Sequence, residues 1–156
     1  TIVRPTLIFG RGSKQIDSIK KFVQMLPVIV PVIGDGQYKV QPVSVEDVAR
    51  VIVSAAIQRP PKRLYYAAGP EHITFDDLLT RIMGRLGIRK HLIHFPYTLV
   101  HAGLSFAGTF VKKLPVNAAQ VSTLCQDGVC SASSDTEKDF GFTFMSFNQI
   151  LDKVFA

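Results

Sequence analysis

Short apolar runs alternate with segments of helical periodicity along this chain of 156 residues. Runs rich in Val, Ile, Leu, Phe and Tyr predict strands over 1–9, 28–33, 64–68 and 91–95, and the alternating segment 37–42 predicts a half-buried strand. Apolar residues that recur every three or four positions predict helices over 16–26, 45–58, 75–86, 96–111, 118–126 and 147–155. This order of elements predicts an α/β fold that ends in helices.

Proline and polar residues mark where these elements bend and begin. Pro5 removes a ladder donor from the first predicted strand, so we expect that strand to bend there or to lie at a sheet edge. Capping boxes are predicted where a hydroxyl residue is followed three positions later by a carboxylate or an amide: Ser44 with Asp47, Thr74 with Asp77 and Ser146 with Gln149. In the helix after Ser44, we expect the face that packs against the protein interior to consist of Val45, Val48, Val51, Ile52 and Ala55.

The chain is basic, with 18 Lys and Arg against 12 Asp and Glu and a net charge of +6. Arg81, Arg85 and Arg89 recur every four positions and would form one stripe of a helix, which we interpret as a solvated face; attraction to an anionic partner such as phospholipid or phosphate is the alternative. No aromatic-rich RNA motif, finger spacing or helix-turn-helix pattern accompanies the charge, which argues against nucleic acid as a partner.

No segment predicts a membrane span or a signal peptide. The longest apolar stretch, 97–111, contains His101 and is too short to cross a bilayer. We therefore expect a cytoplasmic location, with attachment to the periphery of a membrane left open.

Cysteine and histidine spacing predicts no metal site. Cys125 and Cys130 lie five positions apart, which matches neither a redox pair nor a zinc half-site, and we interpret them as reduced thiols. His91 and His94 would point to opposite faces of their predicted strand.

The sequence also predicts no catalytic residue and no dinucleotide fingerprint. The glycine pairs at 10 and 12 and at 34 and 36 do not complete G-x-G-x-x-G, because Gln15 and Lys39 occupy the last position, and we interpret both as turns. No tyrosine is followed four positions later by the lysine that would lower its pKa for proton transfer.

Three segments carry a resemblance to a known family: 4–10 (RPTLIFG), 31–36 (PVIGDG) and 41–50 (QPVSVEDVAR). Together they resemble the second half of an extended or atypical short-chain dehydrogenase/reductase of the NAD-dependent epimerase/dehydratase type. The similarity includes the nucleotide-binding subfamily of the 39-kilodalton accessory subunit of respiratory complex I. Two positions depart from the family pattern, because Ser44 replaces a common histidine and Glu46 an aspartate.

The resemblance implies a division of the chain and a set of binding residues. Residues 1–69 would be the last strands of a Rossmann-like sheet, and 70–156 a small, mostly helical substrate-binding domain. The cofactor, NAD or NADP, would lie against Pro5, Thr6 and Phe9, and the substrate against Gln41 and Val43. Ligands of open α/β sheets bind outside the carboxyl ends of strands, which suits Pro5 and Thr6; a strand end with a proline kink is the alternative interpretation.

The implied function is that of the C-terminal, substrate-side portion of an NAD(P)-binding protein. Such a fragment would neither bind the cofactor well nor catalyse, because the phosphate-binding turn and any catalytic residues would lie in the missing N-terminal half. The full protein could be an oxidoreductase or epimerase acting on a nucleotide-sugar or isoprenoid-like substrate. Alternatively, it could be a non-catalytic subunit that docks on a larger, membrane-associated complex. In a third hypothesis the chain is complete, and it dimerises to cover its exposed sheet.

Overall fold

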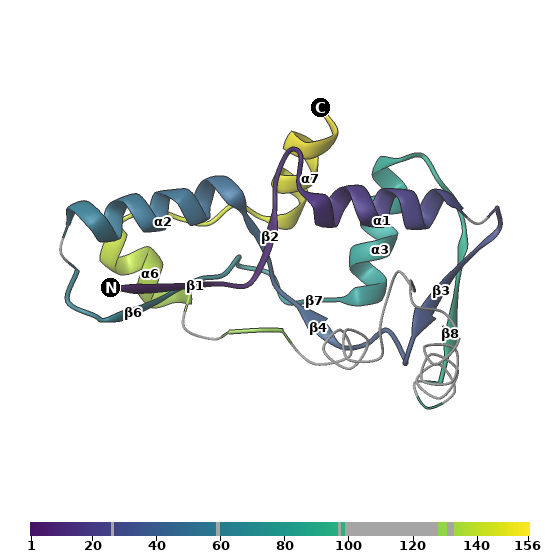
Figure 1. Cartoon of the computed structure of the whole chain (residues 1–156), viewed down its shortest axis with the longest axis horizontal. Helices are drawn as coiled ribbons and strands as arrows, with labels where there is room; N and C mark the ends of the chain where they lie inside the picture. The colour runs from purple at the N-terminus through teal and green to yellow at the C-terminus, as the bar shows by residue number, and fades with distance from the viewer. Residues whose placement is uncertain (26, 59, 97, 99–127, 131–132) are drawn as a thin grey trace, which may run out of the picture.

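The structure of the chain, a computed structural model, describes residues 1–25, 27–58, 60–96, 98, 128–130 and 133–156 (Figure 1). The strands are β1 (Ile2–Pro5), β2 (Leu7–Phe9), β3 (Ile29–Ile33), β4 (Lys39–Val40), β5 (Pro42–Ser44), β6 (Leu64–Ala67), β7 (Ile73–Thr74) and β8 (His91–Phe95). The helices are α1 (Lys14–Met25), α2 (Val45–Ile57), α3 (Phe75–Arg85), α6 (Ser133–Phe140) and α7 (Phe147–Phe155). The predicted α/β class is confirmed.

The first predicted strand is divided at Thr6, as Pro5 led us to expect. β1 pairs in parallel with β6, whereas β2 leaves that partner and pairs in parallel with β5. The amide of Ile2 donates to the carbonyl of Arg63, just before β6, at 2.7 Å, and the amide of Thr6 donates to the carbonyl of Ala67, at the end of β6, at 3.1 Å. Because backbone groups alternate in direction along a strand, Val3 and Pro5 direct theirs away from β6. The missing N–H of Pro5 therefore costs the β1–β6 ladder nothing.

The remaining strands form two further pairs. β3 and β8 pair in parallel over five residues, and β4 and β7 form a short antiparallel pair. In Figure 1, β1 and β6 lie at one end of the molecule beneath α2 and α6, and β3 and β8 lie at the other end. α1, α3 and α7 lie between the middle of the molecule and the β3–β8 end.

Local capping signals predicted the helix starts correctly, with one exception. Thr74 accepts the amide of Asp77 at 3.1 Å, and Ser146 forms a complete capping box with Gln149. Ser44 also caps its helix, but its hydroxyl accepts the amide of Glu46. The predicted box with Asp47 is wrong, because that buried carboxylate accepts a hydrogen bond from a distant loop instead.

The predicted inward face of α2 is partly wrong. Val48 and Val51 are buried and Ala55 packs on the same cluster, as expected. Val45 and Ile52, however, are 47% and 53% exposed. α2 carries apolar residues on two faces, so the period alone did not distinguish the face that meets the sheet.

The alternation predicted for 37–42 also fails at its last polar position. The side chain of Gln41 is buried, although the pattern placed it on the solvent side with Gln37 and Lys39. The segment bends at this residue, which separates β4 from β5.

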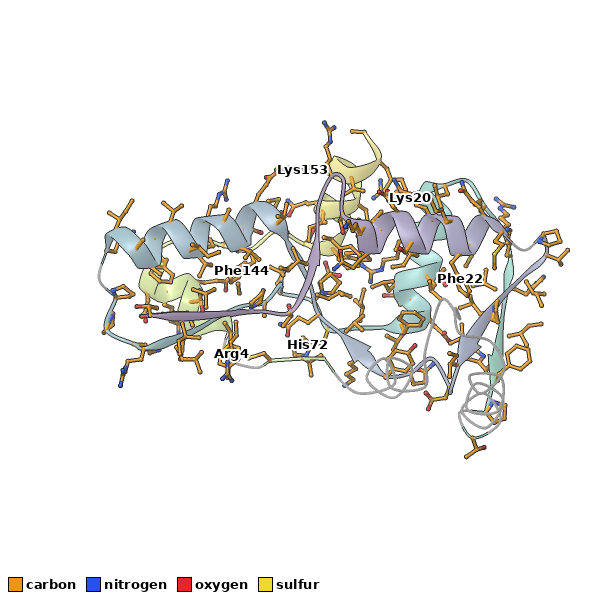
Figure 2. The ribbon with its side chains drawn as sticks, viewed as in Figure 1. Arg4, Lys20, Phe22, His72, Phe144 and Lys153 are labelled. Atoms are coloured by element: carbon orange, nitrogen blue, oxygen red, sulfur yellow. The ribbon has the colours of Figure 1, made fainter. Side chains whose placement is uncertain are left out.

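Two groups of buried apolar side chains hold these elements together. The first, the helical core, contains Phe9, Ile16, Val23, Val30, Val32, Ile73, Leu78, Leu79, Ile82, Met83, Phe147, Ile150 and Leu151. The second, the sheet core, contains Val43, Val48, Val51, Tyr65, Ala67, Phe140 and Phe144. Figure 2 shows Phe144 between α2 and the β1–β6 pair, whereas Arg4 points to the face of β1 away from α2. The domain boundary at residue 69 stays a prediction.

Some predictions fall outside the residues that the structure describes: the helix at 96–111 apart from residues 96 and 98, the whole helix at 118–126, the apolar stretch 97–111 apart from residue 98, and Cys125. Among the helices that are described, none has both the length and the apolar composition needed to cross a membrane.

Candidate functional site

The candidate site lies where the chain passes from β1 to β2. Pro5 and Thr6 stand at the carboxyl end of β1, beside the residues that follow β6. Thr6 anchors the crossing point in two directions, because its amide donates to the carbonyl of Ala67 at 3.1 Å and its hydroxyl to the carbonyl of Gln41 at 2.6 Å. The carboxyl ends of parallel strands are where open α/β sheets bind their ligands.

Gln41 joins three segments at this point. Its side chain is 1% exposed. The amide nitrogen donates to the carbonyl of Gly69 at 2.6 Å, and the amide oxygen accepts the backbone N–H of Cys130 at 2.7 Å. Both polar atoms of the side chain are therefore engaged by backbone groups, and this buried amide fixes the positions of the chains around Thr6.

A glycine permits the close approach of the loop that follows β6. A Cβ atom added at Gly69 would lie 1.9 Å from the carbonyl oxygen of Pro42. Any other residue at this position would push the loop away from β5, and the hydrogen bond from Gln41 would lengthen or break.

The predicted binding residues occupy different depths. Pro5 is exposed and Thr6 is half-buried, next to Gln41. Phe9 is buried in the helical core, with its ring 5.7 Å from that of Phe147, and Val43 is buried in the sheet core. The structure thus brings Pro5, Thr6 and Gln41 together and places Phe9 and Val43 behind them; their roles in binding stay predictions.

A buried carboxylate lies close to the site, at the start of α2. One oxygen of Asp47 accepts the backbone N–H of Met145 at 2.8 Å. The other lies 3.6 Å from a guanidinium nitrogen of Arg50 and has no hydrogen-bond partner among the described residues. Asp47 therefore ties α2 to the chain between α6 and α7.

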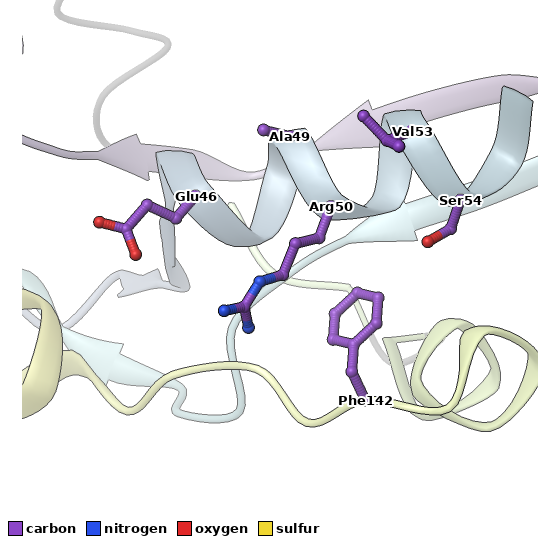
Figure 3. A pocket seen from close by; sticks show the side chains of 6 residues that line it. All are labelled: Glu46, Ala49, Arg50, Val53, Ser54 and Phe142. Carbon is purple, nitrogen blue, oxygen red and sulfur yellow. The ribbon is translucent and has the colours of Figure 1, made fainter.

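An open pocket of about 410 Å³ adjoins this contact. It is lined by Glu46, Ala49, Arg50, Val53, Ser54 and Phe142. Figure 3 shows that Arg50 projects from α2, and Phe142 from the chain between α6 and α7, into the space between these two segments. The hydrogen bond from Lys153 lowers the pKa of Glu46, so this carboxylate is ionised and already paired at the pocket rim.

A tyrosine and a lysine also meet below α6, but not in an arrangement suited to proton transfer. Burial and a hydrogen bond to Asp139 raise the pKa of Tyr65 above its ordinary value. The Lys62 amine bonds to Asp135 at 2.8 Å, which raises the pKa of Lys62 and lowers that of Asp135. A general acid near neutral pH needs a lowered tyrosine pKa, so we interpret this group as structural.

The predicted arginine stripe is shorter than expected. α3 ends at Arg85, so Arg89 does not extend its surface. Arg81 pairs with Glu71 at 2.9 Å, and the other oxygen of Glu71 accepts the amide of Phe147 at 2.7 Å. Arg85 pairs with Asp152. These arginines hold α3 against α7 and are not simply a solvated face.

Metal ligands do not cluster in the part of the chain that the structure describes, where no group of three or more His, Cys, Asp or Glu side chains could hold an ion. His94, one of the two histidines of β8, instead contacts Asp76 at 2.8 Å.

Comparisons with known proteins relate this geometry to a fold. No family model matches the sequence. A curated relative, the mitochondrial NADH dehydrogenase [ubiquinone] 1 alpha subcomplex subunit 9 of Arabidopsis thaliana, is 25% identical over 138 residues. The match covers 87% of this chain but 34% of the relative.

Solved structures of similar fold include enzymes that act on sugar nucleotides. UDP-glucose 4-epimerase of Thermotoga maritima, solved with UDP-glucose, has 13% identity and a TM-score of 0.65, over 98% of this chain and 43% of the enzyme. dTDP-glucose 4,6-dehydratase of Bacillus anthracis, solved with NAD, has 14% identity and a TM-score of 0.64, over 98% and 42%. The predicted resemblance is thus confirmed. The chain is similar in sequence to a complex I subunit, and its fold matches part of NAD-dependent epimerases and dehydratases. It spans less than half the length of each of these proteins.

Proposed function

We propose that this chain is the C-terminal, substrate-side portion of an NAD(P)-binding protein of the short-chain dehydrogenase/reductase class, and that it binds no dinucleotide alone. The observation that carries the proposal is the β1–β6 pair, a parallel sheet of two strands within the described residues. Parallel sheets are normally covered on both faces and contain more strands. Here Ile2 is 59% exposed, and Arg4 projects from the face that α2 does not cover.

The cofactor would approach the carboxyl end of β1. Pro5 fits such a contact, because it is exposed and its carbonyl lies on the side of the strand away from β6. A nicotinamide ring carries a carboxamide, and its N–H groups can donate hydrogen bonds to a backbone carbonyl. Phe9 is too deeply buried to touch a ligand in the present arrangement, and we expect it to hold the strand end in place.

Gln41 and Val43 would support the wall of the site on the side where the substrate binds. Gln41 fixes the loops that carry Gly69 and Cys130 through its two hydrogen bonds. Val43 is buried beneath α2, in the sheet core. Both residues would therefore shape the substrate pocket from behind.

Two versions of the full protein follow. In the first, it is an oxidoreductase or epimerase whose catalytic tyrosine and lysine lie in the N-terminal half. In the second, it is a non-catalytic nucleotide-binding subunit on the membrane-peripheral part of a larger complex. The similarity to a complex I subunit favours the second version, and the sugar-nucleotide enzymes of similar fold favour the first.

The test is to isolate the polypeptide at its natural length, with an antibody against this chain, and to measure its mass and its bound nucleotide. We expect a longer polypeptide that releases NAD or NADP on denaturation, whereas the 156-residue chain purified alone releases none. A longer polypeptide without nucleotide, or a 156-residue chain that retains it, would contradict the proposal.

The same preparation separates the two versions. Reduction of the bound nucleotide on addition of UDP-sugars would identify an enzyme. Co-migration with a large membrane-associated assembly on native gels, without turnover, would identify an accessory subunit.

A further inference from the structure

We infer that the β3–β8 end of the molecule is a docking surface for a membrane that contains anionic phospholipids. The surface, named the basic apolar end, consists of exposed side chains from the end of α1, the residue before β3, the loop before β8 and the outer face of β8: Lys21, Met25, Val28, Arg89 and Ile93. The inference rests on the proposed function in one respect. The missing half is expected at the β1 end, so that the basic apolar end stays uncovered in the full protein.

Large apolar side chains at this end face solvent. Met25 is 71% exposed and Val28 is 61% exposed. On β8, Leu92 packs on the helical core, so the next residue, Ile93, points to the opposite side of the strand, where it is 39% exposed. Apolar side chains that gather at one exposed place commonly mark a site that binds a protein or a membrane.

Hydrogen bonds hold the contributing segments together. The amide of His91 donates to the carbonyl of Val28 at 3.3 Å, and from Ile29 and His91 onward the two strands pair in register. The amine of Lys90 donates to the carbonyl of Val23, in the last turn of α1, at 2.6 Å. Figure 1 shows the end of α1 beside the starts of β3 and β8. The apolar side chains are therefore presented by a fixed surface.

The charge at this end has one sign. Over 18–34 and 78–95, the sequence contains six Lys and Arg and no Asp or Glu. Among the described residues, Lys21 and Arg89 are exposed and form no ion pair. Lys21 lies one helical turn before Met25, on the same side of α1. Positive charge thus surrounds the exposed apolar side chains.

Acidic side chains around this end are distant or already paired. Asp17 lies eight positions before the last residue of α1, about 12 Å along the helix axis. Asp152 of α7 pairs with Arg85. Asp35 lies in the turn after β3, at the far end of that strand, and Asp76 contacts a histidine near the far end of β8. None of these pairings uses the charge of Lys21 or Arg89.

A membrane surface matches both features of this end. The boundary between headgroups and acyl chains accepts apolar side chains, while lysine and arginine beside them bind the phosphates of anionic lipids. Each basic side chain near such a surface strengthens binding by about fivefold. An acidic protein surface would match the charge of Lys21 and Arg89, but it would leave Met25 and Val28 without an apolar partner.

The test measures sedimentation of the natural-length polypeptide with vesicles of phosphatidylcholine, alone or mixed with phosphatidylglycerol. We expect binding to the mixed vesicles only, and weaker binding at high salt. Lys21→Gln with Arg89→Gln should weaken this binding by about tenfold or more. The control Arg63→Gln with Lys138→Gln removes the same charge from exposed positions at the β1–β6 end, and should change it by about twofold at most. No binding, equal binding to both kinds of vesicle, or equal effects of the two double variants would overturn the inference.

A second comparison distinguishes a membrane from an acidic protein or a free phosphate ion. Met25→Ser should weaken binding to the mixed vesicles by about fivefold or more, because the apolar side chain no longer enters the bilayer. Ile57→Ser, at a position of α2 that is 75% exposed, should leave binding unchanged. Unchanged binding of Met25→Ser would indicate attraction by charge alone and would overturn the inference. Displacement of the vesicles by inorganic phosphate at constant ionic strength would also overturn it.

Nucleotide content of the same preparation reports separately on the proposed function. Vesicle binding by a polypeptide that contains no NAD(P) would contradict the proposed function alone. A polypeptide that contains NAD(P) but does not bind the mixed vesicles would contradict this inference alone.

Discussion

The helical core and the sheet core differ in how completely the chain covers them. α3 and α7 bury their apolar faces against each other and α1, and neither helix contributes to the exposed large apolar side chains of the described residues. Around the sheet core, by contrast, Ile2, Val45, Ile52, Val53 and Ile57 are exposed. At the β3–β8 end of the helical core, Met25, Val28, Ile93 and Phe95 are exposed as well. The helical core is therefore closed around α3 and α7 but not at its strands, whereas the sheet core has exposed apolar side chains along β1 and α2.

The candidate site lies at the border between these two regions. Thr6 and Gln41 sit between the two cores, at the strand crossing. The helical core supports this crossing from one side through Phe9. The sheet core supports it from the other side through Val43. In the described part of the chain, β1 of this region has β6 as its one strand partner. Under the proposed function, a ligand site at this position would take its remaining wall from the cofactor-binding half.

The largest expected effect breaks the helical core. Leu79→Ala should lower the free energy of unfolding by about 2–5 kcal/mol, because it leaves a cavity among α1, α3 and α7. The matched control is Ile52→Ala, at an exposed position of α2, for which we expect a change within about 0.5 kcal/mol. Urea unfolding of the 156-residue chain measures both; equal losses would show that the side chain of Ile52 is buried after all.

A second prediction concerns the crossing point itself. Gln41→Ala should cost about 1–3 kcal/mol, because it leaves the carbonyl of Gly69 and the amide of Cys130 without their partner. Gln37→Ala, an exposed residue of the same segment, should change the midpoint of urea unfolding little. Similar midpoints for the two variants would mean that the buried amide contacts do not form.

A smaller effect is expected at the neighbouring hydroxyl. Thr6→Val keeps the shape of the side chain but removes its hydrogen bond to the carbonyl of Gln41, which should cost about 1 kcal/mol. Thr80→Val on the surface of α3 provides the control. Thermal unfolding of the two variants compares them, and an undiminished melting temperature for Thr6→Val would remove this bond from the account.

The smallest effect appears only at alkaline pH. The folded pKa of Tyr65 is raised above 10.0 by burial and by Asp139, so this contribution to stability is present below pH 10.0 and is lost as pH rises through the folded value. Ultraviolet titration should show one phenol that ionises later than the others, and this late step should be missing from the Tyr65→Phe variant. If the step that the variant loses is not a late one, Tyr65 is not buried as described.

Local sequence signals predicted much of the fold. Thr74, Ser146 and Pro5 act within a few residues of themselves, and their effects were predicted correctly. The contacts of Asp47 and Gln41 were missed because their partners lie 98 and 89 positions away. For α2, periodicity showed two apolar faces without indicating which one meets the sheet.

For the candidate site as well, features set by local sequence were predicted and features set by long-range contacts were missed. The strand-end rule and the family resemblance placed Pro5 and Thr6 at the carboxyl end of β1, where the structure has them. The depth of Phe9 and the engagement of both Gln41 polar atoms depend on long-range packing. A local pattern carries no signal for either feature.

Hydrogen exchange compares the two regions most directly, in the 156-residue chain and in the natural-length polypeptide. In the shorter chain, we expect a peptide covering residues 1–9 to exchange much faster than peptides from α3 and α7, because β1 pairs with one strand only among the described residues. In the longer polypeptide, residues 1–9 should become protected while α3 and α7 change little. Equal protection of both regions in the shorter chain, with no gain in the longer one, would contradict the account.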